Sequence, residues 1–189
     1  DENQNNVEIE QSYSSNQIIR VNHPTVPEEY WLIENRQKIG SDTLLPEPGL
    51  AIWHINDDIA QGWAPNNNEP YYGVGLEQAD GMFALENGGP SNGGDVYPGT
   101  TNNREFSNSS NPNTSSLYGE PSMLRIDNIS DPGDFMTFDV EYNEIISQWN
   151  ELSIDAEKIR KQGLSLAMQM KGEDESGRNS LHLHALGLK

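Results

Sequence analysis

The feature that most constrains the fold of this chain is the shortness of its apolar segments. Before residue 140, each segment spans only six or seven residues and is bounded by Gly, Pro, Asn, Asp or Ser. No stretch of this region keeps a helical apolar period for more than about two turns. Short apolar runs between turn residues are typical of β-strands, so we predict strands near residues 16–21, 29–35, 49–55, 72–78, 124–129 and 136–142.

The order of apolar residues inside these segments indicates how they are covered. Residues 30–33 and 50–55 are nearly continuous apolar runs, which are typical of strands buried on both faces. Residues 136–142 alternate apolar and polar side chains, as in a strand with one face in the core and one in water. The sequence therefore predicts an all-β fold, a sandwich or a barrel.

Two long loops interrupt the predicted strands. Residues 56–71 and 86–117 are polar and rich in Asn, Gly and Ser. Loops longer than about 12–15 residues are uncommon in compact domains and are usually functional or disordered. We therefore expect these Asn/Gly-rich loops either to be anchored or to be mobile.

The last part of the chain follows a different pattern. Its apolar residues first recur at steps of four and three, which predicts a helix that ends at Gly163. Residues 164–170 and 181–184 then alternate around a charged turn, which predicts a β-hairpin. We thus divide the chain into a β-rich domain, residues 1–140, and a C-terminal helix and β-hairpin appendage, residues 141–189.

Charge and composition exclude several classes of function. The chain has 30 acidic and 11 basic residues, a formal charge of −19, which argues against nucleic acid and anionic membranes as partners. No apolar run approaches the roughly 20 residues of a membrane span. The first residues do not form a signal peptide, although an already cleaved one stays open. Without cysteine the chain has no disulfide, thiolate metal site or thiol nucleophile.

The acidic residues in and beside the long loops suggest a calcium site. Ca²⁺ binds carboxylates, Asn side chains and loop carbonyls, and a bound cation would order the loops and relieve their repulsion. No EF-hand pattern is present, so individual ligands rest on position alone. The alternative is a solvated acidic surface, as on many secreted proteins. The candidate ligands are Asp57, Asp58, Asp80 and Asp95.

The sequence gives little support for a catalytic site. It contains no HExxH, GxSxG or Walker motif, so we expect no zinc and no enzyme activity in this chain. Acid pairs that could serve a glycosidase are expected by chance in so acidic a chain. His54 lies inside a predicted strand, where a buried, hydrogen-bonded histidine is the simplest interpretation. His182 and His184 would share a strand face and could ligate a metal together, but a polar, solvent-facing strand edge is the simpler interpretation.

Residues 28–140 resemble a known family. The segment from Glu29 to Gln37, EYWLIENRQ, is similar to the E-Y-[FW]-L-L-E-N-R-Q segment of the immune inhibitor A family of secreted bacterial zinc metallopeptidases. Further similar stretches follow in the family's order. They lie at residues 45–50, 52–55, 76–81, 94–99, 126–130 and 136–140.

The resemblance implies a part of such a peptidase and not the whole. In the family these segments lie C-terminal to the catalytic HExxH helix, and this chain has neither that helix nor the zinc ligands. The resemblance therefore implies a secreted, non-catalytic region, and calcium dependence in some members fits the acidic loops. Within the shared EYWLIENRQ segment, Glu34 and Arg36 lie on one strand face, and we expect them to form a partly buried pair that links two strands.

Three functions remain open from the sequence. The first is a non-catalytic extracellular β-domain whose partner is the catalytic part of a peptidase. The second is a subunit of a filament or surface layer that contacts copies of itself through the C-terminal helix and hairpin. The third is a carbohydrate-binding module that uses the loop aromatics Trp63, Tyr71 and Tyr72.

Overall fold

The structure is a computed structural model, and it describes residues 2–142. The predicted C-terminal helix and β-hairpin lie outside these residues, and the division at residue 140 stays a prediction. Within the described part, helix is limited to α1 and the short 3₁₀ turn η1, Gly40–Asp42. The strands are β1, Gln4–Glu10; β2, Ile19–Asn22; β3, Glu29–Arg36; β4, Gly49–Asn56; β5, Val74–Leu76; β6, Phe106–Ser107; β7, Leu124–Asp127; and β8, Phe135–Tyr142, with α1 at Asp57–Ala60.

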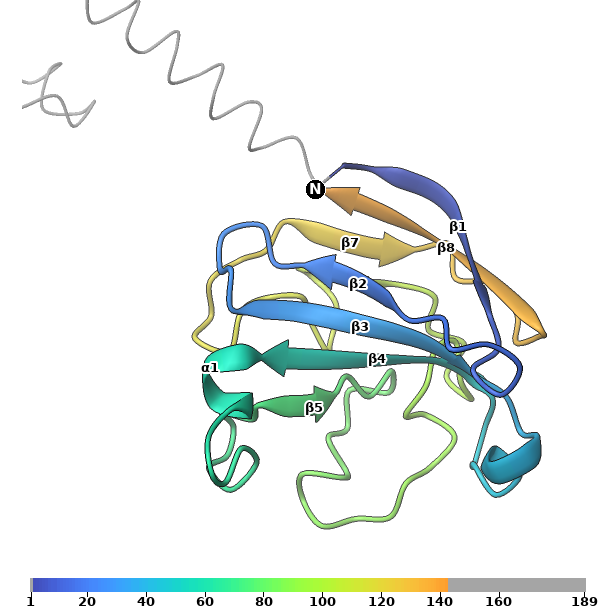
Figure 1. Ribbon diagram of the computed structural model, residues 1–189, viewed down its shortest axis with the longest axis horizontal. Helices are drawn as coiled ribbons and strands as arrows, with labels where there is room; N and C mark the ends of the chain where they lie inside the picture. The colour runs from blue at the N-terminus through green and yellow to red at the C-terminus, as the bar shows by residue number, and fades with distance from the viewer. Residues whose placement is uncertain (1, 143–189) are drawn as a thin grey trace, which may run out of the picture. The chain divides into compact units, whose positions relative to one another are not determined.

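The strands form two four-stranded antiparallel sheets (Figure 1). One sheet has the order β1-β8-β7-β6 and the other β2-β3-β4-β5, which confirms the all-β prediction as a sandwich. Their inner faces share one core, in which Trp31 and Ile52 of the second sheet pack with Ile126 and Phe138 of the first. All four side chains are almost completely buried, as expected when two amphipathic sheets cover each other.

The predicted strands are present, and two further strands were missed. β4 is buried at seven of its eight positions, as its apolar run predicts, and β8 alternates as its pattern predicts. β1 was missed because it is a polar edge strand in which only Ile9 is fully buried. β6 was missed because it is two residues long, within the 86–117 loop.

Both long loops are anchored by contacts within the domain. The 86–117 loop inserts the fully buried Tyr97 into the core, and Tyr97 exchanges two backbone hydrogen bonds with Leu50 at 2.8 and 2.9 Å. The 56–71 loop begins with α1, whose first turn is capped by the Asn56 side chain accepting from Ile59 N at 3.0 Å. Core and cap contacts therefore anchor these loops, as the sequence led us to expect for one of the two alternatives.

The predicted pair of Glu34 and Arg36 is confirmed. Arg36 Nη1 lies 3.1 Å from Glu34 Oε1, and both side chains are partly buried. Glu34 also accepts from Trp53 Nε1 at 2.9 Å, which joins β3 to β4, while Arg36 donates two bonds to Asp42. The pair therefore links two strands and the turn that follows β3.

Side-chain amides occupy the outer edges of β1 and β5. The Asn66 amide donates to Val74 O at 2.7 Å and accepts from Val74 N at 3.1 Å. The Gln17 amide accepts from Glu10 N at 3.0 Å and donates to Glu8 O at 3.4 Å. Such contacts use backbone groups that would otherwise pair with another chain. Assembly by strand addition would thus have to displace them at these two positions.

Candidate functional site

His54 lies between two glutamates at one end of the second sheet. Strands β3 and β4 pair so that Trp31 is opposite His54 and Glu29 opposite Asn56, and the inward alternation places all four side chains on the core side. His54 Nε2 lies 2.9 Å from Glu29 Oε2, and Nδ1 lies 3.2 Å from Glu77 Oε1, just after β5. The buried, hydrogen-bonded histidine predicted from the sequence is confirmed.

The two glutamates keep His54 charged. Burial lowers the pKa of the imidazole, but the hydrogen bonds and charges of Glu29 and Glu77 outweigh it and raise that pKa to about 9. Burial raises the pKa of Glu29, and its bonds from His54, Leu117 N and Asn56 Nδ2 lower it overall. At neutral pH the site thus holds an imidazolium with two carboxylates, of which Glu29 is fully buried.

A second histidine on the other side of Trp31 behaves in the opposite way. The Trp31 ring stacks on His54 with centroids 5.1 Å apart and lies 5.8 Å from His23. His23 Nδ1 accepts from the backbone N–H of Val26 at 3.1 Å, so this nitrogen carries no proton. Burial lowers the pKa of His23 and keeps it neutral.

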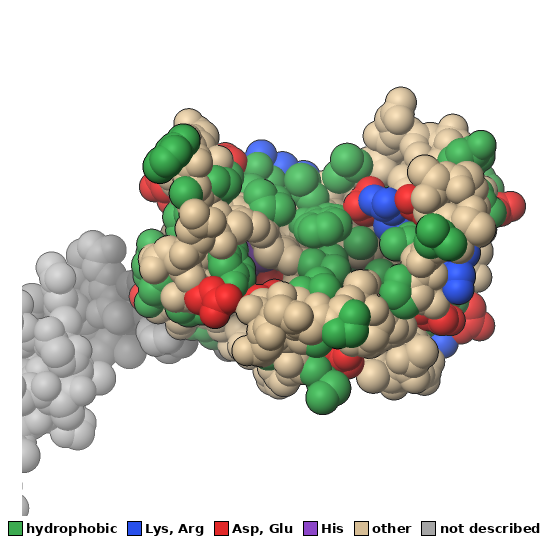
Figure 2. Space-filling model, turned by 90° about the horizontal axis from the view of Figure 1, so that it is seen from below, with side chains coloured by type: hydrophobic (Ala, Val, Ile, Leu, Met, Phe, Trp, Pro, Cys, Tyr) green, Lys and Arg blue, Asp and Glu red, His purple; other side chains and the backbone are tan. Residues whose placement is uncertain are grey.

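A cavity of about 470 Å³ opens beside His54 and Glu77. In Figure 2, the face seen from below is hollowed, hydrophobic side chains gather in the hollow, and acidic side chains lie beside the visible histidine surface. The cavity combines apolar and acidic walls. Its other principal lining side chains are Glu69, Pro70, Tyr72, Leu76, Phe83, Glu86, Pro112 and Leu117.

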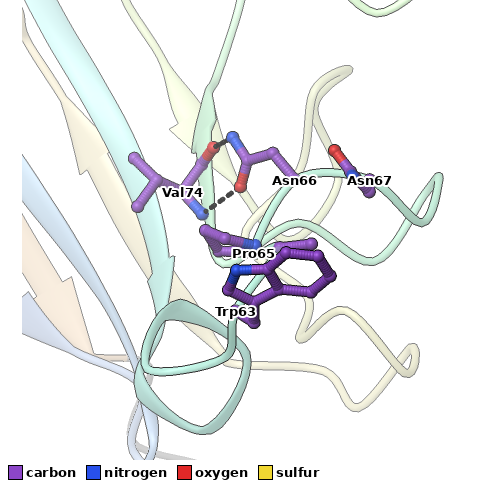
Figure 3. A pocket seen from close by; sticks show the side chains of 6 residues that line it. Trp63, Pro65, Asn66, Asn67 and Val74 are labelled. Carbon is purple, nitrogen blue, oxygen red and sulfur yellow. Dashed lines mark hydrogen bonds between the residues drawn. The ribbon is translucent and has the colours of Figure 1, made fainter.

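A second, open hollow of about 500 Å³ lies beside Trp63. Trp63 is fully exposed, and Figure 3 shows it with Pro65, Asn66, Asn67 and Val74 around the hollow. The two Asn66–Val74 hydrogen bonds fix the loop next to the indole, and Asn67 also lines the hollow (Figure 3). The tryptophan is therefore presented to solvent on a loop tied to β5.

The three aromatics proposed for sugar binding do not share one surface. Trp63 lines the open hollow, whereas Tyr72 lines the cavity beside His54. Tyr71 stacks on Tyr118, with ring centroids 5.3 Å apart. Only Trp63 presents an uncovered ring face next to a hollow.

The four candidate calcium ligands fall into two places. Asp57 and Asp58 lie in α1, where Asp57 accepts a hydrogen bond from the Tyr30 hydroxyl at 3.0 Å. Asp80 and Asp95 lie on neighbouring turns joined by the bond from Asp80 N to Gly94 O. In residues 2–142, no group of three or more His, Asp or Glu side chains is arranged to hold a metal ion. The structure thus brings Asp80 near Asp95 and supplies no carboxylate cage.

Asp95 is the candidate with an unexplained oxygen. Its Oδ2 accepts from Ser91 Oγ at 2.6 Å and from Asn92 N at 2.7 Å. Its Oδ1 is buried and has no hydrogen-bond partner among the described residues. A buried carboxylate oxygen without a partner is costly, so a water or a cation would fit at this position.

Sequence reasoning missed Glu29 as a functional residue. Its signal was the alternation in β3, where Glu29, Trp31, Ile33 and Asn35 share the buried face. A charged residue on an inward strand face requires a partner, and His54 on the neighbouring strand supplies it.

Comparison with known proteins gives no match: no family model, curated protein or solved structure matches this chain. Among the described residues, no helix combines the length and apolar character needed to cross a membrane. The fold and the site define a β-sandwich with a buried carboxylate–histidine–carboxylate cluster beside an acidic cavity.

Proposed function

We propose that the described domain is a non-catalytic extracellular β-domain with a structural or partner-binding role. The observation that carries the proposal is that carboxylates occupy both ring nitrogens of His54. An imidazolium with a pKa of about 9 has no free lone pair at neutral pH to act as a general base. Its bonds instead connect β3, β4 and the segment after β5, which is a structural role.

Sequence features supply the extracellular part of the proposal. They are the resemblance of residues 28–140 to the post-catalytic region of immune inhibitor A-like peptidases and the charge of −19. In this proposal the partner is the catalytic part of a peptidase or further copies of the chain.

The proposal predicts that no turnover depends on His54. Wild-type protein and a His54→Gln variant are incubated with chromogenic peptide, ester and glycoside substrates at pH 7, with and without Zn²⁺. We expect the same background rate in both proteins, because the imidazole is saturated by Glu29 and Glu77. Turnover that is present in the wild type and lost in a folded His54→Gln variant would contradict a non-catalytic role.

We also propose that calcium binds near Asp95 and orders the loop around it. Its unpartnered Oδ1, with Asp80 on the adjoining turn, supports this assignment. A ligand present at 100 times its Kd stabilises the folded state by about 2.7 kcal/mol, so we expect excess Ca²⁺ to raise Tm over EDTA by roughly 5–10 °C.

Thermal unfolding with metal analysis on the same sample measures this shift. Asp95→Asn should abolish it, whereas Asp58→Asn, on the exposed face of α1, should keep it. An equal Tm in Ca²⁺ and EDTA, or an unchanged shift in Asp95→Asn, would leave the acidic loops as a solvated surface.

Carbohydrate binding is the second candidate function, and the exposed Trp63 favours it. An indole face beside a hollow with neighbouring amides is suited to stack on a sugar ring. On a glycan array, we expect Trp63→Ala to remove binding without changing Tm, because the ring is fully exposed. Tyr13→Ala removes another exposed aromatic and should leave binding unchanged. A wild-type protein that binds no glycan, or a Trp63→Ala variant that binds equally, would exclude this function.

A further inference from the structure

The cavity beside His54 has the charge and the walls of a binding pocket. Its volume of about 470 Å³ lies within the usual range for ligand sites. The apolar part of its lining includes Leu76, Pro112 and Leu117, and Tyr72 and Phe83 add two aromatic rings. Three glutamates complete it: Glu69, Glu77 and Glu86.

The charges in this cavity do not cancel. Among the described residues, His54 is the one cation that lines the cavity, and it already pairs with the buried Glu29 and with Glu77, which also lines the cavity. Along with desolvation, Glu69 and Glu86 both help to raise the pKa of Tyr72 to about 12, and Glu86 accepts a hydrogen bond from the buried Gln78. Within residues 2–142, no Lys or Arg forms an ion pair with any of the three glutamates. The cavity is therefore negative overall and favours a cationic occupant.

We propose that this cavity binds an arginine side chain presented by a partner protein. A planar guanidinium can donate to two carboxylates at once and stack on an aromatic face, which matches Glu69 and Glu86 next to Tyr72 and Phe83. An ammonium group matches the charge but not the flat walls. This inference names the partner chemistry for the partner-binding role proposed above and rests on that role.

The test titrates the full chain with acetyl-Gly-Arg-Gly-amide and follows backbone amides by NMR. The matched peptide with citrulline keeps the shape of arginine and removes its charge. We expect saturable shifts of the amides of Gly75, Leu76, Asn87 and Ser115, which line the cavity. We expect about tenfold weaker binding of the citrulline peptide, and weaker binding of a lysine peptide.

Variants locate the site. Glu69→Gln and Glu86→Gln together should weaken binding of the arginine peptide by about tenfold, because both negative groups that would face the guanidinium are lost. Glutamine at position 86 can still accept from Gln78, which preserves the local contact. Glu8→Gln removes an exposed acid on β1, outside the cavity lining, and should change nothing.

Three results would overturn the inference. They are no saturable shift at millimolar peptide, equal binding of the arginine and citrulline peptides, and unchanged affinity in the double variant with its Tm intact. Equal binding of the lysine peptide would overturn the choice of a guanidinium. Mass spectrometry of the recovered peptide separates this test from that of the proposed function, because cleavage would refute the non-catalytic role while an intact, unbound peptide would refute only the pocket.

Discussion

Replacing Glu29 with glutamine is expected to lower the free energy of unfolding by about 3 kcal/mol. The Glu29 carboxylate is fully buried and accepts hydrogen bonds from His54 Nε2 at 2.9 Å, Leu117 N at 3.0 Å and Asn56 Nδ2 at 3.1 Å. A neutral amide has one acceptor oxygen in place of two and leaves the imidazolium with Glu77 alone. Removing one partner of a buried ion pair is costly because the other charge stays buried.

Urea unfolding followed by tryptophan fluorescence measures this loss. Glu8→Gln makes the same chemical change at an exposed site on β1 and should alter stability by less than about 0.5 kcal/mol. A His54→Gln variant and the double variant complete a thermodynamic cycle. Glu29 and His54 are in direct contact. The sum of the stability losses in the two single variants should therefore exceed the stability loss in the double variant. A Glu29→Gln protein as stable as the Glu8→Gln control would show that the pair contributes little.

The same site marks the limit of what the sequence could predict. The strands near residues 29–35 and 49–55 were predicted because their apolar side chains are adjacent along the chain, and the pair of Glu34 and Arg36 because strand residues two apart share a face. The contact of Glu29 with His54 needs in addition the register that sets Glu29 opposite Asn56 and Trp31 opposite His54. Strand register depends on turns and on the packing of the whole sheet, and no local pattern supplies it.

The acidic residues and the loop aromatics illustrate the same limit. From chain position we could place Asp57, Asp58, Asp80 and Asp95 in loops. Chain position could not show that the first two lie in α1 and the last two on the turns around Gly94. Chain position could also mark Trp63, Tyr71 and Tyr72 as loop aromatics. It could not show that one lines the open hollow, one stacks on Tyr118 and one lines the cavity beside His54. Long loops follow paths fixed by a few buried anchors such as Tyr97, and such anchors are visible only in the folded chain.

The charged state of His54 leads to the second large effect, a loss of stability between pH 6.5 and 9. In the folded protein His54 keeps its proton up to a pKa of about 9, while the unfolded chain releases it near the usual value of 6.5. The folded state therefore binds more protons across this range. The stabilisation is complete below pH 6.5 and is lost as the pH rises to 9. A pKa raised by this amount corresponds to about 3 kcal/mol.

Urea midpoints measured from pH 6 to 9 test this prediction, with an NMR titration of the histidine ring protons to assign the group. The His54→Gln variant should show a nearly flat profile over this range. A wild-type profile that is equally flat, or a His54 ring that titrates near pH 6.5, would refute the raised pKa.

Two further buried groups, His23 and Glu29, act at lower pH and in the opposite direction. The lowered pKa of His23 means that the unfolded chain binds a proton there more readily, so stability falls as the pH drops below 6.5. The lowered pKa of Glu29 adds a loss as the pH falls from its usual value of 4.5 through its folded value. The free energy of unfolding should therefore be highest near pH 6.5. In a variant without His54 it should stay constant further toward alkaline pH, while the loss below pH 6.5 that His23 causes should remain. Two histidines on opposite sides of Trp31 thus limit the pH range of one core from opposite directions.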